Sequence, residues 1–175
     1  MDDASAGFNV HLGPSLPSDI SVTATGAIFT TKNNFQAILH DRGGPAGVPQ
    51  KNVDCMPYAA CCVAALQALL AREVAPADSA VISVIQLQME DGQLLSIMPS
   101  KINIVGPMRA LTVQAQLRLQ SRLEQVLHAQ FASCRCTAEL DWHMYVNALY
   151  LVPINNAQLG KWRPKQRLRC WEVTM

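Results

Sequence analysis

Pro57-Tyr-Ala-Ala-Cys61-Cys62-Val-Ala-Ala-Leu-Gln-Ala-Leu-Leu-Ala71 is the stretch that decides the fold of this 175-residue chain. Alanine and leucine favour a helix, and proline is tolerated in a first helical turn. Asp54 can accept hydrogen bonds from the free amides of that turn. The run is apolar nearly all round, which predicts a helix inside the protein, and it is shorter than the roughly twenty residues that span a bilayer. We therefore expect a buried central helix.

The composition predicts one globular domain with no general affinity for polyanions. Half of the residues are hydrophobic, 15% are charged, and 14 basic against 13 acidic side chains give a net charge of +1. Such a balance gives no overall electrostatic case for nucleic acid or an anionic membrane. The acidic, small-residue start lacks the apolar region of a signal peptide. An intracellular protein is expected, with the cytoplasm favoured over the mitochondrion.

The pattern on either side of the central helix predicts antiparallel strands and a second helix. Residues 112–131 show helical spacing of apolar side chains. Asp91-Gly92 is typical of a hairpin turn, and Gly106-Pro107 predicts the end of a strand. β-Branched and alternating runs predict strands over 20–40 (a hairpin turning at 32–34), 81–89, 94–98 and 101–105. They also predict one or two closing strands within 142–152 and 168–173. Runs of strands interrupted by two helices indicate an α+β fold.

The chain has six cysteines, which are too few for a disulfide scaffold of this length. One pair is vicinal and another has the form Cys-x-Cys, whereas structural zinc sites favour Cys-x-x-Cys. No metal site is therefore expected. Buried cysteines that behave as small hydrophobic residues are the ordinary interpretation, and a reactive thiol is the alternative.

Two cysteine motifs resemble those of the OsmC/Ohr family of thiol-dependent hydroperoxide reductases. The first is Tyr58-Ala-Ala60-Cys61-Cys62-Val-Ala-Ala65-Leu66, and the second is Cys134-Arg-Cys136-Thr after the second helix. The resemblance covers about residues 20–152. It implies an OsmC-like α+β fold with antiparallel sheets around the buried central helix, a second long helix, and an intertwined homodimer. The implied domains are an arm over 1–17, the OsmC-like domain over 18–152, and a basic C-terminal extension over 153–175 that closes on a strand.

The resemblance also implies a function, the thiol-dependent reduction of organic hydroperoxides. Cys61 would attack a small-molecule hydroperoxide, Cys134 or alternatively Cys136 would resolve the sulfenic acid, and an external dithiol would regenerate the pair without a bound cofactor. The thiolate needs the helix-end amides and a guanidinium, since burial alone opposes ionisation. Arg42 is the upstream arginine. Asp54 lies nearest to the place of the family's glutamate, three residues closer to the cysteine.

A second hypothesis is a catalytically silent OsmC-like scaffold, or a subunit of a larger assembly. The C-terminal extension carries basic side chains at every second position, which a strand would place on one face. Such a face could contact RNA or an acidic protein, or it could simply be solvated. These residues are Lys161, Arg163, Lys165, Arg167 and Arg169. No membrane partner is expected.

Overall fold

The computed structural model describes residues 11, 17, 25–75, 78–90, 94–142 and 152–158. Contacts divide the chain into a compact unit of residues 27–154 and another formed by residues 1–26 and 155–175. Short strands β1 (Gly26–Ala27) and β9 (Ile154–Asn155) form a two-stranded sheet. The five basic positions of the C-terminal extension, residues 168–173 and all but the two end residues of 142–152 lie outside the described residues. The expected closing strands and basic face therefore stay predictions.

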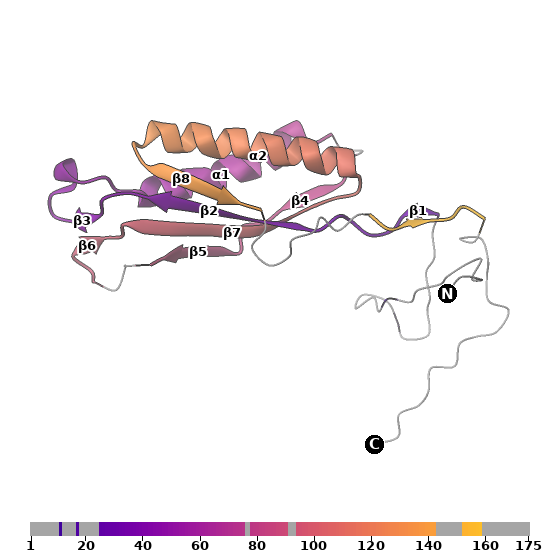
Figure 1. The fold of residues 1–175 in the computed structure, drawn as a ribbon, viewed down its shortest axis with the longest axis horizontal. Helices are drawn as coiled ribbons and strands as arrows, with labels where there is room; N and C mark the ends of the chain where they lie inside the picture. Colours follow the sequence, from indigo (N-terminus) through magenta and orange to yellow (C-terminus); the bar gives the residue numbers. More distant parts are fainter. Residues whose placement is uncertain are drawn as a thin grey trace, which may run out of the picture. The chain divides into compact units, whose positions relative to one another are not determined.

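A five-stranded antiparallel sheet forms the main unit, and β7 lies at its centre (Figure 1). The order is β4-β7-β2-β8, and β5 also pairs with β7. β7 is ten residues long, which lets it pair with β2 on one side and with β4 and β5 on the other. The five strands are β2 (Asn33–His40), β4 (Ala80–Ile82), β5 (Gln86–Met89), β7 (Lys101–Ala110) and β8 (Thr137–Asp141).

Helices α1 (Met56–Glu73) and α2 (Val113–Ser133) cover one face of this sheet (Figure 1). The register places Ala37 opposite Ile104, and both side chains are fully buried in the core with Leu66 of α1 and Leu123 of α2. Burial of a large aliphatic side chain contributes about 1.5–3 kcal/mol, so this shared core is what holds the helices on the sheet.

The expectation of an α1 buried all round is wrong. Ala59, Cys62, Leu66 and Leu69 are buried, whereas the opposite side of the helix, including Cys61, is exposed. The sheet packs against one side of α1 only. The alanine side chains on the other side are small, so their exposure to solvent costs little. The OsmC-like arrangement of sheets around a central helix is therefore not formed. No helix in the described ranges is long and apolar enough to cross a membrane.

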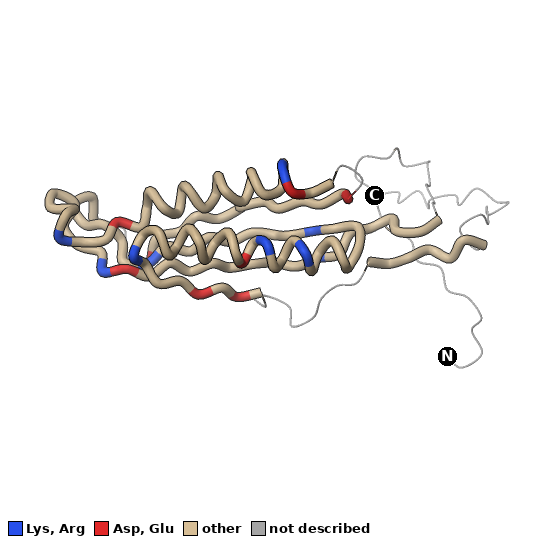
Figure 2. Tube along the Cα trace, turned by 90° about the horizontal axis from the view of Figure 1, so that it is seen from above, with Lys and Arg blue, Asp and Glu red and all other residues tan. Residues whose placement is uncertain are grey.

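The expected second helix is present over nearly the predicted range. The Thr112 side chain accepts a hydrogen bond from Ala115 N at 3.0 Å, which caps its first turn. Arg122 of α2 donates to Glu73 at the end of α1, with an Nε–Oε2 distance of 2.6 Å, so an ion pair links the two helices. The helices run side by side (Figure 2).

Several expected strand boundaries are wrong. Asn33 and Asn34 begin β2 instead of forming a hairpin turn. β7 continues through Gly106-Pro107, because Gly106 has no side chain to block the Ser83 carbonyl. The remaining changes are that 81–89 divides into β4 and β5, that 94–98 contributes only β6 (Ile97–Met98), and that β8 was not expected.

Candidate functional site

The candidate site is the loop of residues 41–55 between β2 and α1, here called the β2–α1 loop. It contains the short strand β3 (Gly44–Pro45), which pairs with β6, and the single turn η1 (Pro49–Lys51). Loops held by a rigid scaffold are where binding residues are most often found. The sequence predicts a loop here from its Gly and Pro content, and the structure shows how it is held.

Asp41 fastens both ends of the loop. Its backbone N–H donates to Ser100 O at 2.9 Å. One carboxylate oxygen accepts from Cys55 N at 3.0 Å, at the start of α1, and the other accepts from Gly43 N. Hydrogen bonds to a charged acceptor are stronger than neutral ones. A single side chain therefore sets where the loop leaves the sheet and where it enters the helix.

Two glycines give the loop a path that other residues could not follow. Gly43 and Gly44 have φ values of +53° and +130°. A Cβ at Gly43 would lie 2.8 Å from Met98 O, and one at Gly44 would lie 2.5 Å from Asn52 Oδ1. Asn52 in turn donates to Pro45 O and Val48 O, each at 3.3 Å. The loop is thus closely packed, and its backbone is fixed by side-chain hydrogen bonds.

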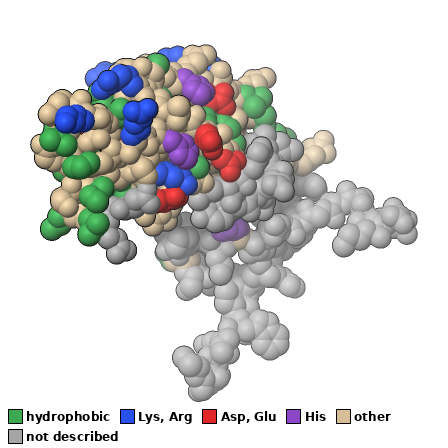
Figure 3. All heavy atoms as spheres, turned by 60° about the vertical axis from the view of Figure 1, so that its left-hand side comes forward, with side chains coloured by type: hydrophobic (Ala, Val, Ile, Leu, Met, Phe, Trp, Pro, Cys, Tyr) green, Lys and Arg blue, Asp and Glu red, His purple; other side chains and the backbone are tan. Residues whose placement is uncertain are grey.

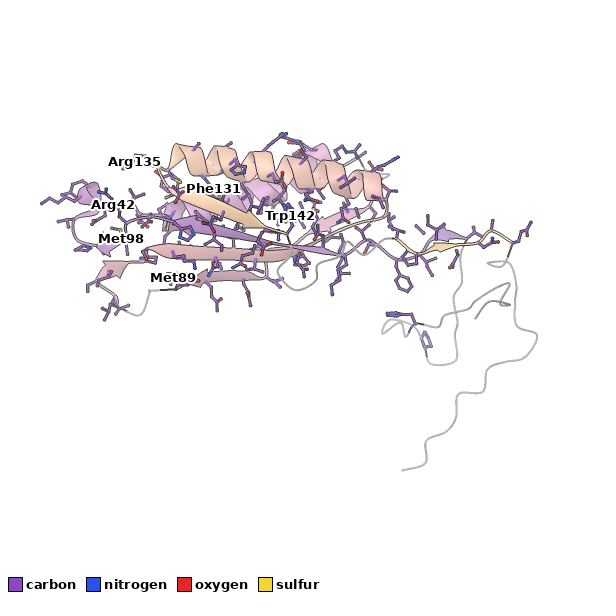
Figure 4. The ribbon with its side chains drawn as sticks, viewed as in Figure 1. Arg42, Met89, Met98, Phe131, Arg135 and Trp142 are labelled. Atoms are coloured by element: carbon purple, nitrogen blue, oxygen red, sulfur yellow. The ribbon has the colours of Figure 1, made fainter. Side chains whose placement is uncertain are left out.

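Basic side chains gather at this end of the unit. Arg42 and Lys51 of the loop are exposed, and so is Arg135 in the turn between α2 and β8. Arg135 has φ of +60°, the only positive φ outside glycine in the described ranges. Figure 4 shows Arg42 and Arg135 at the same end, and Figure 3 shows basic, acidic and histidine side chains on the face around it. His40 lies 3.9 Å from Glu139, from Nε2 to Oε1.

The two vicinal cysteines of α1 differ in their exposure to solvent. Cys61 lies on the exposed side of α1, whereas its neighbour Cys62 is buried. Burial, with smaller contributions from the neighbouring Cys134 and Cys61, raises the pKa of Cys62 to about 12. A thiol with so high a pKa is a poor nucleophile at neutral pH.

The other expected site residues lie at the same end of the unit as the β2–α1 loop, because the Asp41 charge influences Cys136 and Asp54 precedes Cys55, which donates to Asp41. Cys134 is buried at the end of α2, where its thiol donates to Phe131 O at 3.0 Å. Burial, with smaller contributions from Cys134 and Asp41, raises the pKa of Cys136 to about 12. Asp54 accepts from Met56 N at 3.0 Å, as expected of a residue before a helix. Arg42 belongs to the β2–α1 loop.

Asp41, Gly43, Gly44 and Asn52 are the residues that sequence reasoning missed. An Asp followed two residues later by paired glycines is a signal for a turn closed by the Asp side chain. That signal was present in the sequence, but it does not reveal that the same carboxylate reaches Cys55, fourteen residues further on. In the described part of the chain, no group of three or more His, Cys, Asp or Glu side chains could hold a metal ion.

The fold matches part of larger proteins of known structure. A solved structure of a putative aminohydrolase from methicillin-resistant Staphylococcus aureus matches with a TM-score of 0.70 and 18% identity. The match covers 79% of this chain and 35% of that one. At this identity the likeness shows the fold alone, and it overturns the OsmC-like fold class.

Curated relatives match most of this chain. IAA-amino acid hydrolase ILR1-like 2 of Arabidopsis thaliana is 31% identical over 141 residues, which is 81% of this chain and 31% of the relative. N-acetyldiaminopimelate deacetylase of Bacillus cytotoxicus is 28% identical over 143 residues, or 82% of this chain and 38% of the relative. No family model matches. The chain thus spans about a third of the length of these relatives.

These findings correct the expected function. The resemblance to OsmC/Ohr proteins is wrong, because it rested on two short motifs of common residues, and the relatives over four fifths of the chain are hydrolases. The functions that depended on this resemblance are overturned as well. They are hydroperoxide reduction, the antioxidant oxidoreductase class and the silent OsmC-like scaffold.

Proposed function

We propose that this chain forms the accessory part of an amide hydrolase that acts on N-acylated amino acids. The observation that carries the proposal is the extent of the match, about four fifths of this chain but only about a third of each hydrolase relative. Both relatives are named for substrates in which an acyl group is joined to an amino acid. In this proposal the residues that attack the amide lie in the portion of the hydrolase beyond the match.

The β2–α1 loop is the part of the chain that would contact the substrate. An N-acyl amino acid carries a free carboxylate, which a planar guanidinium binds through two parallel hydrogen bonds. Arg42 and Arg135 supply exposed guanidiniums just beyond the paired ends of β2 and β8, where His40 lies opposite Thr137. The fixed backbone of the loop would hold Arg42 ready for binding, so that little entropy is lost.

A domain replacement tests this function directly. Residues 27–154 would replace the matching third of the Arabidopsis hydrolase, and release of the free amino acid from indoleacetyl-amino acids would be followed. The proposal expects a folded hybrid that releases amino acid. A hybrid that is folded by circular dichroism and shows no release above a hybrid carrying an unrelated domain of similar size would overturn it.

The full 175-residue chain is the second arm of the experiment. Assayed alone with the same substrates, with and without added Zn²⁺ or Mn²⁺, it should release no amino acid. Turnover by the chain alone would contradict the accessory role while leaving the substrate class in place.

We also propose that two copies of the chain pair through β5. All four residues of this strand are exposed, and among the described strands it pairs only with β7. Leu87 and Met89 lie opposite Ile104 and Ile102, hence on the helix-covered side of the sheet, yet they are 47% and 44% exposed. Free edges of monomers normally carry charges, whereas residues 79–89 contain none.

A second copy suits this edge because antiparallel strands related by a twofold axis offer each other the same surface. Leu87→Lys should convert a dimer into a monomer in sedimentation velocity. Leu117→Lys is the matched control, since Leu117 is an exposed leucine of α2 on a different surface. A wild-type chain that stays monomeric at 100 μM, or a dimer that Leu87→Lys leaves intact, would contradict the pairing.

A further inference from the structure

Two cysteines from distant parts of the sequence meet at the Asp41 carboxylate. The β2–β8 ladder ends with His40 opposite Thr137, so the next residues along the two strands are Asp41 and Cys136. Asp41 also accepts a hydrogen bond from the backbone of Cys55, with an N–Oδ2 distance of 3.0 Å. Cys55 and Cys136 therefore both lie next to Asp41.

The packing of the two thiols supports this placement. Cys55 is fully buried in the core, and Cys136 is partly buried and packs against the same core cluster. The Cys136 thiol donates to Cys134 O at 3.6 Å. Burial is the main cause that raises the pKa of each thiol, and Asp41 raises both. Cys136 also raises the pKa of Cys55, and Cys134 also raises that of Cys136.

We propose that Cys55 and Cys136 form a disulfide when a small-molecule disulfide such as oxidised glutathione is present. Cys136, the more accessible thiol, would attack one sulfur of the reagent and release one thiol. Cys55 would then attack the Cys136 sulfur of the mixed disulfide. The Asp41 carboxylate accepts the Cys55 proton and passes it to the leaving thiolate, which departs as the second thiol. Two protein thiols are oxidised and one reagent disulfide is reduced, so electrons and protons balance.

The bond would fasten the β2–α1 loop to the turn between α2 and β8. It would join residues 81 positions apart, since 136 − 55 = 81. Closing so long a loop restricts the unfolded chain, and the melting temperature should rise by roughly 5–15 °C. The inference does not depend on the proposed hydrolase function, since it concerns only the redox state of the chain.

Peptide mapping identifies the partners. The full chain would be equilibrated with reduced and oxidised glutathione at a series of ratios, alkylated, and digested without reduction. Trypsin cleaves after Lys51, Arg72 and Arg135, which separates Cys136 from Cys134. Chymotrypsin cleaves after Tyr58, which separates Cys55 from the vicinal cysteines. The expected product joins peptide 52–58 to the peptide that begins at Cys136.

Two variants make the outcome decisive. Cys136→Ser should abolish both the linked peptide and the rise in melting temperature, while Cys61→Ser, which changes an exposed cysteine, should leave both unchanged. A link through Cys134 or the vicinal cysteines would overturn the proposal. So would the recovery of both cysteines as free thiols under conditions that oxidise a model dithiol completely.

Discussion

Gly106 is where the sheet should be most sensitive to a single added methyl group. It lies in β7 opposite Phe35, at the point where the neighbouring edge changes from β4 to β5. A Cβ at this position would lie 1.7 Å from Ser83 O and 3.2 Å from Phe35 Cε1. The Ser83 oxygen belongs to the backbone, so it can move away only if the edge of the sheet moves with it.

The structure allows the cost of Gly106→Ala to be estimated. Moving residues 83–85 away from β7 strains the bonds Ser83 N–Pro107 O (3.1 Å) and Ile85 N–Val105 O (2.9 Å). Each is worth about 1 kcal/mol net. Overpacking of the buried site adds about 1–3 kcal/mol. The free energy of unfolding should therefore fall by about 3–5 kcal/mol.

Urea unfolding followed by circular dichroism measures this change. With a slope near 2 kcal/mol per M, the midpoint should fall by about 2 M with the slope unchanged. Gly47→Ala is the matched control, because a Cβ there meets nothing within 4 Å. Its effect should stay within about 0.5 kcal/mol. A Gly106→Ala variant as stable as Gly47→Ala would refute the close approach of Ser83 to β7.

Three further predictions concern the helices. Leu123→Ala should destabilise the chain by about 2–5 kcal/mol in the same urea assay, because Leu123 is fully buried, whereas Leu117→Ala at an exposed site should cost little; equal effects would contradict the assigned face of α2. Thr112→Ala should cost about 1 kcal/mol through loss of the cap on Ala115 N, and Thr112→Ser should restore most of it. Burial raises the pKa of Cys62 from 9.0 to about 12, so this thiol loses its proton at lower pH in the unfolded chain than in the folded one. The free energy of unfolding should therefore fall as pH rises from about 9 towards 12, and it should fall by less in Cys62→Ala. Equal slopes of melting temperature against pH in the two proteins would contradict a buried Cys62 thiol.

The helices could be predicted from the sequence because their signals are local. The spacing of Leu119, Leu123 and Leu127 gives α2 its buried stripe, and Thr112 marks its start. The prediction that α1 is buried all round failed for a physical reason. Alanine suits both a crowded interior and a solvent-exposed helix face, so composition could not show that only one side of α1 meets the sheet.

The sheet and the site depend on contacts that are remote in sequence. β7 continues through Gly106-Pro107 because Ser83 approaches there, and nothing near Pro107 shows this. The hydrogen bond from Cys55 N to the Asp41 carboxylate likewise joins residues that only the fold brings together. The cysteine motif was misleading because Cys61 and Cys62 are adjacent on α1, yet one is exposed and the other buried.

The role of Arg42 in the domain-replacement hybrid tests the central claim most directly. Loss of a charged hydrogen bond to the substrate carboxylate costs about 1.5–3 kcal/mol, which is roughly 10–100-fold in kcat/KM. Arg42→Gln should therefore lower kcat/KM by that factor for an N-acyl amino acid, and by less than about twofold for the same compound with its carboxylate converted to a carboxamide. Lys51→Gln, at another exposed position of the β2–α1 loop, should change neither value. An equal loss on both substrates, or no loss on either, would contradict the account of this loop as part of a hydrolase's substrate site.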